Sequence, residues 1–305
     1  MEYKNKSNLE KALSEGKFAV TAEIGPPKGS DPDQIKQKAE ILKGYAHAYN
    51  ITDNQAAVVR MSSLAGCCIL LGMEMEPVMQ MACRDRNRIA LQSDVLGASA
   101  LGIRNILFIT GDHQSLGNHP SSRGVYDIDS IQLIQIVKNM RDNGIFQNGE
   151  EILRGNPSIF IGSAANPYAT PYEIRVDRLE KKIYAGVDFI QTQSVFNIER
   201  FNEWMDEVRS RGLDKKVHIL AGVTPLKSIK MTERMKYYIP GVDVPDAIEK
   251  RMKNASDPKK EGYEIALEII KEIKKIKGIH GVHITALFWE SIIPSLISES
   301  GLVPR

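Results

Sequence analysis

Short apolar runs alternate with longer amphipathic segments along most of the chain. A run of four to eight apolar residues between turn formers predicts a strand buried on both faces, whereas apolar residues at three- and four-residue steps predict a helix. The predicted strands are residues 18–23, 48–52, 77–83, 105–110, 158–164, 188–192, 217–222 and 281–285. The predicted helices include residues 33–45, 88–101, 130–140, 171–184, 198–208 and 261–277.

About eight strands that alternate with helices predict parallel βαβ units, and eight such units close a (β/α)8 barrel. We therefore expect a single (β/α)8 TIM-barrel domain over residues 1–305. The segment 239–260 carries four prolines and glycines at turn positions, and it predicts a helical insertion before the last strand. Asp33 and Ser130 are expected to cap helix N-termini, and Gly186 and Gly278 to end helices.

The composition favours a cytoplasmic protein that binds neither nucleic acid nor a membrane. Hydrophobic residues make up 42%, and the net charge of +2 indicates neither nucleic acid nor a membrane surface as a partner. No apolar run approaches the roughly 20 residues that span a bilayer, and the first residues show no apolar export signal. Cys67, Cys68 and Cys83 make a poor disulfide framework, and their spacing predicts no metal site.

Polar residues stand at the ends of four predicted strands, where a core strand would be apolar. They are Glu23, the run Thr52-Asp53-Asn54, the run Thr110-Gly111-Asp112 and the run Gln191-Thr192-Gln193. Each alone is explained as a helix cap or turn former. Together they lie at the same end of a predicted barrel, where active sites form. Glu23 is notable because a carboxyl group at the end of a buried strand is costly to ionise without compensation.

Other candidate residues are less decisive. Gly111 lacks a Cβ and suggests a close approach of backbone to a ligand. Arg84, Arg86 and Arg88 follow the third strand, and they either grip phosphates or carboxylates or form an exposed, internally paired helix start. Both alternatives stay open. His283 is interpreted as a structural histidine, and neither a Rossmann nor a Walker glycine pattern is present.

Four blocks of sequence together resemble the methylenetetrahydrofolate reductase family. They lie at residues 22–27, 83–88, 109–112 and 182–193, and the likeness extends from Phe18 to Arg305. The arginine-rich block is most similar to the bacterial short forms, a branch that includes the reductase half of homocysteine methyltransferase fusions. The resemblance implies a flavin-dependent TIM barrel that reduces 5,10-methylenetetrahydrofolate to 5-methyltetrahydrofolate in one-carbon metabolism and methionine biosynthesis.

The resemblance also implies roles for individual residues. Glu23 corresponds to the general acid, Asp112 to an aspartate near flavin and pterin, and Gln193 to a glutamine that contacts the substrate. The positions that match the family's flavin site are Thr52, Gly111, Asp112, Tyr126 and Lys182. Gln80 and Asn166 stand where some members have histidine and tyrosine, and Thr110 replaces an arginine. These departures leave FMN open beside FAD.

The electron donor and the assembly stay open at this point. The resemblance implies NAD(P)H as a donor, or a separate zinc or iron–sulfur subunit of the kind that serves similar short chains in some anaerobic bacteria. A homo-oligomer is compatible with either. Two other functions remain as alternatives: a flavin-holding subunit of a larger electron-transfer complex, and a pterin-binding methyltransferase barrel without a redox cofactor.

Overall fold

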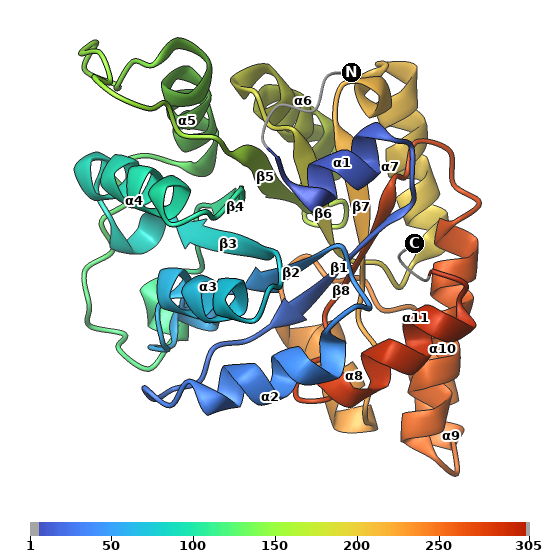
Figure 1. Cartoon of the computed structure of the whole chain (residues 1–305). Helices are drawn as coiled ribbons and strands as arrows, with labels where there is room; N and C mark the ends of the chain where they lie inside the picture. Colours follow the sequence, from blue (N-terminus) through green and yellow to red (C-terminus); the bar gives the residue numbers. More distant parts are fainter. Residues whose placement is uncertain (1–5, 303–305) are drawn as a thin grey trace.

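Eight parallel strands close into one barrel in the computed structural model, which describes residues 6–302 (Figure 1). Each strand pairs with the next along the chain, and the last pairs with the first. The strands are β1 (Ala19–Ile24), β2 (Ala48–Ile51), β3 (Pro77–Ala82), β4 (Asn105–Ile109), β5 (Phe160–Ala165), β6 (Phe189–Ser194), β7 (His218–Val223) and β8 (Gly281–Ile284). The predicted (β/α)8 fold is confirmed. The end of the family resemblance, residues 303–305, lies outside the described residues.

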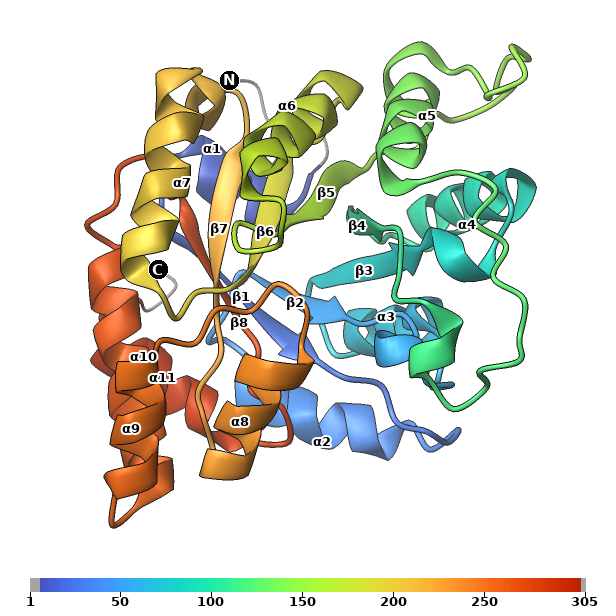
Figure 2. The ribbon, with the colours of Figure 1, turned by 180° about the vertical axis from the view of Figure 1, so that it is seen from behind.

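Helices surround the barrel and close one of its ends (Figures 1 and 2). They are α1 (Asn8–Ser14), α2 (Asp33–Leu42), α3 (Ser63–Gly72), α4 (Arg88–Ala100), α5 (Ser130–Asn143), α6 (Arg175–Ala185), α7 (Ile198–Ser210), α8 (Ile229–Tyr238), α9 (Asp246–Asn254), α10 (Pro258–Ile273) and α11 (Ile293–Glu299). The helices α8, α9 and α10 all lie between β7 and β8, and α9 contacts both others. The predicted helical insertion before the last strand is therefore present.

Both predicted N-caps were wrong by one residue. Helix α5 is capped by Asp129, which accepts from the backbone N–H of Gln132 in a capping box, so Ser130 is its first residue. Helix α2 begins at Asp33, and the N-cap position before it is Pro32. Aspartate and serine are both good capping residues, so residue type alone could not decide between Asp129 and Ser130. Gly186 ends α6 in the left-handed conformation, as predicted.

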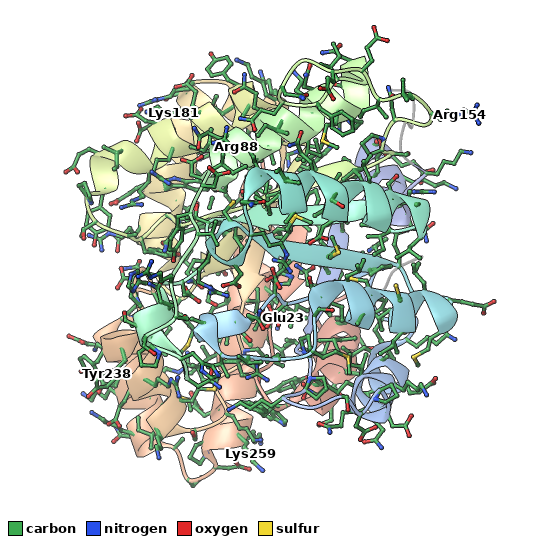
Figure 3. All side chains as sticks on the ribbon, turned by 90° about the vertical axis from the view of Figure 1, so that its left-hand side faces the viewer. Glu23, Arg88, Arg154, Lys181, Tyr238 and Lys259 are labelled. Atoms are coloured by element: carbon green, nitrogen blue, oxygen red, sulfur yellow. The ribbon has the colours of Figure 1, made fainter. Side chains whose placement is uncertain are left out.

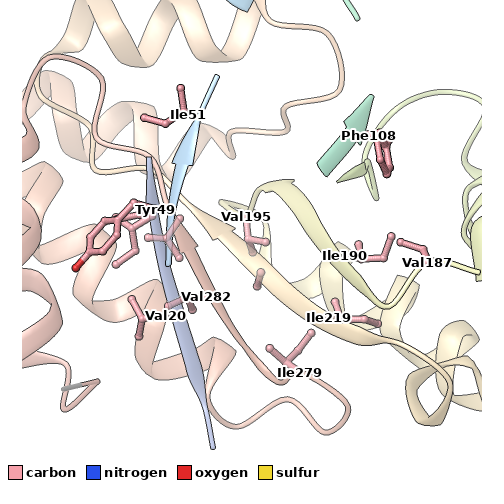
Figure 4. Close-up of a cluster of buried hydrophobic side chains, with 14 of the residues drawn as sticks. Val20, Tyr49, Ile51, Phe108, Val187, Ile190, Val195, Ile219, Ile279 and Val282 are labelled. Carbon is pink, nitrogen blue, oxygen red and sulfur yellow. The ribbon is translucent and has the colours of Figure 1, made fainter. Parts of the chain in front are cut away.

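The strands bury apolar side chains on both faces. Outward-facing residues such as Val20, Ile190 and Ile219 pack under the helices, and Figure 4 shows part of this cluster. Full burial of each such side chain stabilises the fold by about 1.5–3 kcal/mol. A second cluster fills the N-terminal half of the barrel interior, where Leu9 and Leu13 of α1 meet Ala19, Ala48, Val78, Leu107, Phe160, Phe189 and Leu220. Helix α1 therefore closes the N-terminal end.

The opposite end of the barrel stays open to the loops that follow the strands. Inward-facing positions there carry polar side chains instead of apolar ones, beginning with Thr21, Asn50 and Gln191 above the apolar layer. Among the described residues, no helix combines the length and the apolar character needed to cross a membrane.

Candidate active site

A cavity of about 750 Å³ occupies the C-terminal end of the barrel. That volume falls within the range of pockets that hold small ligands and cofactors. Seven of the predicted site residues line it: Glu23, Gln80, Gly111, Asp112, Asn166, Lys182 and Gln193. Thr52, Thr110 and Tyr126 are not in its wall. Three of the four polar strand ends identified in the sequence, those of β1, β4 and β6, thus converge on one mouth, whereas Thr52, Asp53 and Asn54 after β2 do not line it.

Glu23 lies deep in this mouth, one residue before the end of β1. Its side chain is only 10% exposed, and its Oε2 lies 3.8 Å from Nε2 of His283 on β8. Figure 3 shows Glu23 near the centre of the molecule, whereas Arg154, Lys181 and Tyr238 lie toward its outside. The strand period places Glu23 on the barrel interior together with Thr21, two residues earlier.

Gln193 reaches the cavity because β6 is irregular at that point. The register between β6 and β7 shifts between Gln191 and Ser194. The hydroxyl of Thr192 accepts from the backbone N–H of Gly222 at 2.9 Å and so replaces a ladder bond there. A bulge of this kind re-aims a side chain, a device common beside active sites. The side-chain oxygen of Gln193 accepts from the backbone N–H of Ser194 at 3.0 Å. The NH₂ group of the same side chain has no partner in residues 6–302.

The loop after β4 is built around Gly111 and Asp112. Gly111 has φ of +94°, and a Cβ there would lie 3.1 Å from Cβ of Arg84 and 3.2 Å from Cβ of Ala82. The protein's own packing thus explains the glycine, and ligand contact at Gly111 stays a prediction. The Asp112 carboxylate accepts from the N–H of Ala56 at 3.1 Å. Its backbone carbonyl accepts from the hydroxyl of Tyr126 at 3.2 Å.

The three arginines after β3 are internally paired. Arg84 binds Asp85 at 2.6 Å and also donates to the carbonyls of Asn54 and Asp112, so it ties together the loops after β2, β3 and β4. Arg86 pairs with Asp53 at 2.6 Å and with Asp94 at 2.9 Å. Arg88 pairs with Asp127 at 2.7 Å. The structure favours the alternative of a paired scaffold, although Arg84 is buried, not exposed.

The remaining predicted flavin positions differ in how they are satisfied. The hydroxyl of Thr52 is buried without a hydrogen-bond partner among the residues that the structure describes. Thr110 donates to the hydroxyl of Ser130 at 3.2 Å and so joins its loop to α5. The side-chain oxygen of Asn166 accepts from two backbone N–H groups, at 3.1 and 3.2 Å. The amide of Gln80 faces the cavity and has no partner within the described part of the chain.

Lys182 brings a buried positive charge to the cavity wall. Its Nζ donates to the hydroxyl of Ser163 at 3.0 Å and to the carbonyl of Ala164 at 2.5 Å. Burial, and secondly the charge of Arg178, lowers the pKa of Lys182 to about 8. Within residues 6–302, no carboxylate lies within salt-bridge distance of it. A cation that is bonded only to neutral oxygens is prepared for an anionic ligand.

Comparison with known proteins identifies the family. The family model described as methylenetetrahydrofolate reductase matches residues 8–301. This chain belongs to the methylenetetrahydrofolate reductase family.

Relatives within the methylenetetrahydrofolate reductase family are distant in sequence. The "probable methylenetetrahydrofolate reductase (NADPH)" of Caenorhabditis elegans is 20% identical over 96% of this chain, which spans only 44% of that relative's length. The 5,10-methylenetetrahydrofolate reductase of Pectobacterium carotovorum is 24% identical, with 86% of this chain and 84% of that protein covered.

A similar fold occurs in a solved structure of a protein from Clostridium thermocellum, described as binding two copies of 5-methyl-5,6,7,8-tetrahydrofolic acid. The TM-score is 0.70 at 17% identity, with 96% of this chain and 97% of that chain covered. At this identity the likeness shows the barrel fold. A 2,3-dimethylmalate lyase structure has a TM-score of 0.50 at 10% identity.

Four residues in the cavity wall of this methylenetetrahydrofolate reductase family member were missed from the sequence. Arg175, Arg178 and Arg234 line the cavity, and none of them pairs with a carboxylate in the described residues. His283 also lines it, although it was interpreted as structural. The three- and four-residue steps from Arg175 through Arg178 to Lys182 place all three on one helix face, and this spacing could have indicated the cluster.

Proposed function

We propose that this chain reduces 5,10-methylenetetrahydrofolate to 5-methyltetrahydrofolate with a bound flavin. The observation that carries the proposal is one cavity in which Glu23, Asp112 and Gln193 meet a row of cations that pair with no carboxylate of residues 6–302. The family match over residues 8–301 supports the reaction. The fold likeness to a protein that binds 5-methyl-5,6,7,8-tetrahydrofolic acid supports a folate as the ligand.

The cations fit the phosphates of a flavin nucleotide. Arg175, Arg178 and Lys182 form a row on α6 at the cavity wall, and phosphate oxygens would supply the negative charge that no carboxylate of the described residues gives them. Arg175 and Lys182 are seven residues apart, about 10 Å along a helix axis. A row of this length can serve either the two phosphates of FAD or the single phosphate of FMN. When bound, the reduced flavin would supply the hydride.

Glu23 would supply the proton. The methylene bridge of the substrate joins two nitrogens and accepts hydride poorly until one carbon–nitrogen bond opens. Glu23 would donate its proton to that nitrogen, the bond pair would move onto the nitrogen, and the carbon would become a cationic iminium that accepts the hydride. A mouth closed by the substrate would exclude water from this carbon.

Asp112 and Gln193 would orient and stabilise the substrate. The Asp112 carboxylate lies in the cavity wall, where a negative charge would stabilise the iminium cation. The free NH₂ group of Gln193 would donate to an acceptor on the pterin ring, and the bulge in β6 holds it there. The Gln80 amide offers a further donor and acceptor in the same cavity.

An absorption spectrum of the purified protein, followed by anaerobic addition of NADH and then methylenetetrahydrofolate, tests the proposal. We expect a flavin spectrum that bleaches when reduced and recovers its colour with the folate. NAD(P)H would serve as the donor if the first addition bleaches the flavin. If only a strong artificial reductant does so, a zinc or iron–sulfur partner subunit would be the donor.

A colourless protein that takes up neither FAD nor FMN would overturn the proposal. Methyl transfer to a cobalamin or a thiol without flavin would instead indicate a methyltransferase barrel. Flavin binding without folate reduction, with any donor, would indicate a flavin-holding subunit.

A further inference from the structure

His283 connects Glu23 to a buried hydrogen-bond chain inside the barrel. The residue is 7% exposed, and each ring nitrogen has a defined neighbour. Its Nδ1 lies 3.0 Å from the hydroxyl oxygen of Thr21, and its Nε2 lies 3.2 Å from the hydroxyl oxygen of Thr285. The same Nε2 lies 3.8 Å from Oε2 of Glu23. The tautomer of the ring therefore decides whether Glu23 faces an N–H donor or a nitrogen without a proton.

The chain continues on the other side of Thr21. The NH₂ group of Gln191 donates to the hydroxyl oxygen of Thr21 at 3.0 Å and to the side-chain oxygen of Asn50 at 3.1 Å. The NH₂ group of Asn50 in turn donates to the side-chain oxygen of Gln191 at 2.7 Å. In the structure the pair of amides is oriented so that the NH₂ group of Gln191, and not its side-chain oxygen, faces Thr21.

This orientation sets the direction of the remaining bonds. A threonine hydroxyl carries one proton and can donate once. Because Thr21 accepts from Gln191, its own proton is free for the acceptor within reach, which is Nδ1 of His283. A neutral imidazole that accepts at Nδ1 carries its proton at Nε2.

We propose that the buried chain of Asn50, Gln191 and Thr21 holds neutral His283 with its proton on Nε2, so that His283 is a positioning residue that keeps an N–H donor beside Glu23. The tautomer follows from the orientation of the Gln191 amide toward Thr21. Its catalytic consequence rests on the function proposed above.

The distances indicate that Nε2–H of His283 bonds to Thr285 before the proton transfer and to Glu23 after it. At 3.8 Å, Nε2 is too far from Glu23 for a hydrogen bond, so in the resting site Nε2–H bonds to Thr285. After Glu23 gives its proton to the substrate nitrogen, it is a carboxylate, which accepts hydrogen bonds more strongly than a neutral hydroxyl. Nε2–H of His283 then stabilises the newly charged Glu23. This interaction forms as the proton leaves Glu23 and is absent while Glu23 is protonated.

The tautomer is tested by NMR on protein with ¹⁵N-labelled histidine at about pH 8, above the ordinary histidine pKa of about 6.5. The His283 signals are assigned by their loss in His283→Gln. We expect the Nε2–H form in the unmodified protein and in Thr285→Val, and loss of that preference in Thr21→Val. An Nδ1–H ring in the unmodified protein, or equal effects of the two threonine substitutions, would overturn the proposal.

The positioning role is tested by comparing His283→Leu with His283→Gln, since glutamine keeps an N–H donor and leucine does not. We expect kcat to fall about 10- to 100-fold in His283→Leu, the range of a hydrogen bond to a charged group, with KM for the folate within about twofold. His283→Gln should recover most of this loss. Flavin content and thermal unfolding check that both variants fold.

Equal losses in the leucine and glutamine variants, or a change confined to KM, would refute the positioning role. Absence of folate reduction in the unmodified protein would refute the proposed function instead, because the NMR result does not depend on it.

Discussion

Arg178 lies one helical turn before Lys182 on α6, and its charge adds to the effect of burial in lowering the pKa of Lys182 to about 8. Neither of these two cations pairs with a carboxylate of the described residues, so their mutual repulsion raises the energy of the site. An anion placed between them would relieve that cost. The first two predictions follow from this pair.

Replacement of Lys182 by methionine should lower flavin affinity at least tenfold, the loss expected for a buried charge-assisted hydrogen bond to phosphate. Lys181→Met is the matched control, because Lys181 is the exposed neighbour on the same helix. Titration of the apoprotein with FAD, followed by fluorescence, measures both. Equal affinity in the two variants would contradict the assignment of Lys182 to the anion.

Flavin affinity should also fall as the pH rises through about 8. Below its folded-state pKa of about 8, Lys182 is charged and attracts phosphate, whereas above that pKa it is neutral. Bound phosphate favours the charged form, so binding takes up protons in this range. The decrease should be absent in Lys182→Met, and the same titration repeated from pH 7 to pH 9.5 measures it.

Glu23→Gln should keep the flavin and lose folate reduction by a factor of about 100 or more, since a general acid contributes about 10²- to 10⁴-fold. Glutamine keeps the shape of the side chain but has no acidic proton. Glu40→Gln on the exposed face of α2 serves as the control. The flavin spectrum and kcat with methylenetetrahydrofolate are measured for both. Wild-type turnover in Glu23→Gln would show that another group delivers the proton.

The folded state should lose stability as the pH falls from about 6.5 to about 4. Burial, and secondly the charge of His280, lowers the pKa of His218 to about 4 from an ordinary value of 6.5. Between these values the unfolded chain binds a proton that the folded chain excludes, so protons favour unfolding. The two rings pack edge to face at 5.1 Å.

Urea unfolding at pH 7.5 and pH 5 should therefore show a smaller pH effect in His218→Phe than in the unmodified protein. The exposed His119→Gln should behave like the unmodified protein. An unchanged pH effect in His218→Phe would mean that other groups control acid stability.

Gly111→Ala should destabilise the protein by about 1–3 kcal/mol, because φ of +94° is strained for any residue with a Cβ. The new Cβ would also press on Arg84 and Ala82 at 3.1 and 3.2 Å. Gly97→Ala is the control, since Gly97 lies within α4 with open space around it. Urea unfolding should show that this control is neutral or stabilising by up to about 1 kcal/mol. Equal results for both variants would contradict the packing argument.

Much of the fold could be predicted because it depends on local pattern. Each strand was found within two residues of its observed ends. Apolar content and turn residues are properties of short segments, and a barrel made from eight such segments brings their carboxyl ends together. That relation predicted the meeting of Glu23 and Gln193 in one cavity. Helix caps were harder, since Asp129 and Ser130 are both good capping residues and backbone geometry chose between them.

The paired and unpaired charges could not be predicted in the same way. The sequence left the block at Arg84, Arg86 and Arg88 open between ligand and protein partners, and the structure supplied Asp85, Asp53 and Asp127. Arg178 and Lys182 carry similar charges but have no carboxylate partner in the described part of the chain. Asp53 and Arg86 are 33 residues apart in sequence. Pairing depends on distance through space, which local pattern does not encode.

By itself, the sequence determined the order of the strands, the barrel, and the polar residues that end β1, β4 and β6. Only the tertiary structure decided which of those residues reach the cavity and what they face there. The bulge at Gln193 and the contact between His283 and Glu23 both depend on neighbouring strands that are distant in the chain. Hydrogen bonds act over about 3 Å, so their partners, and with them the chemistry of the site, appear only when the barrel closes.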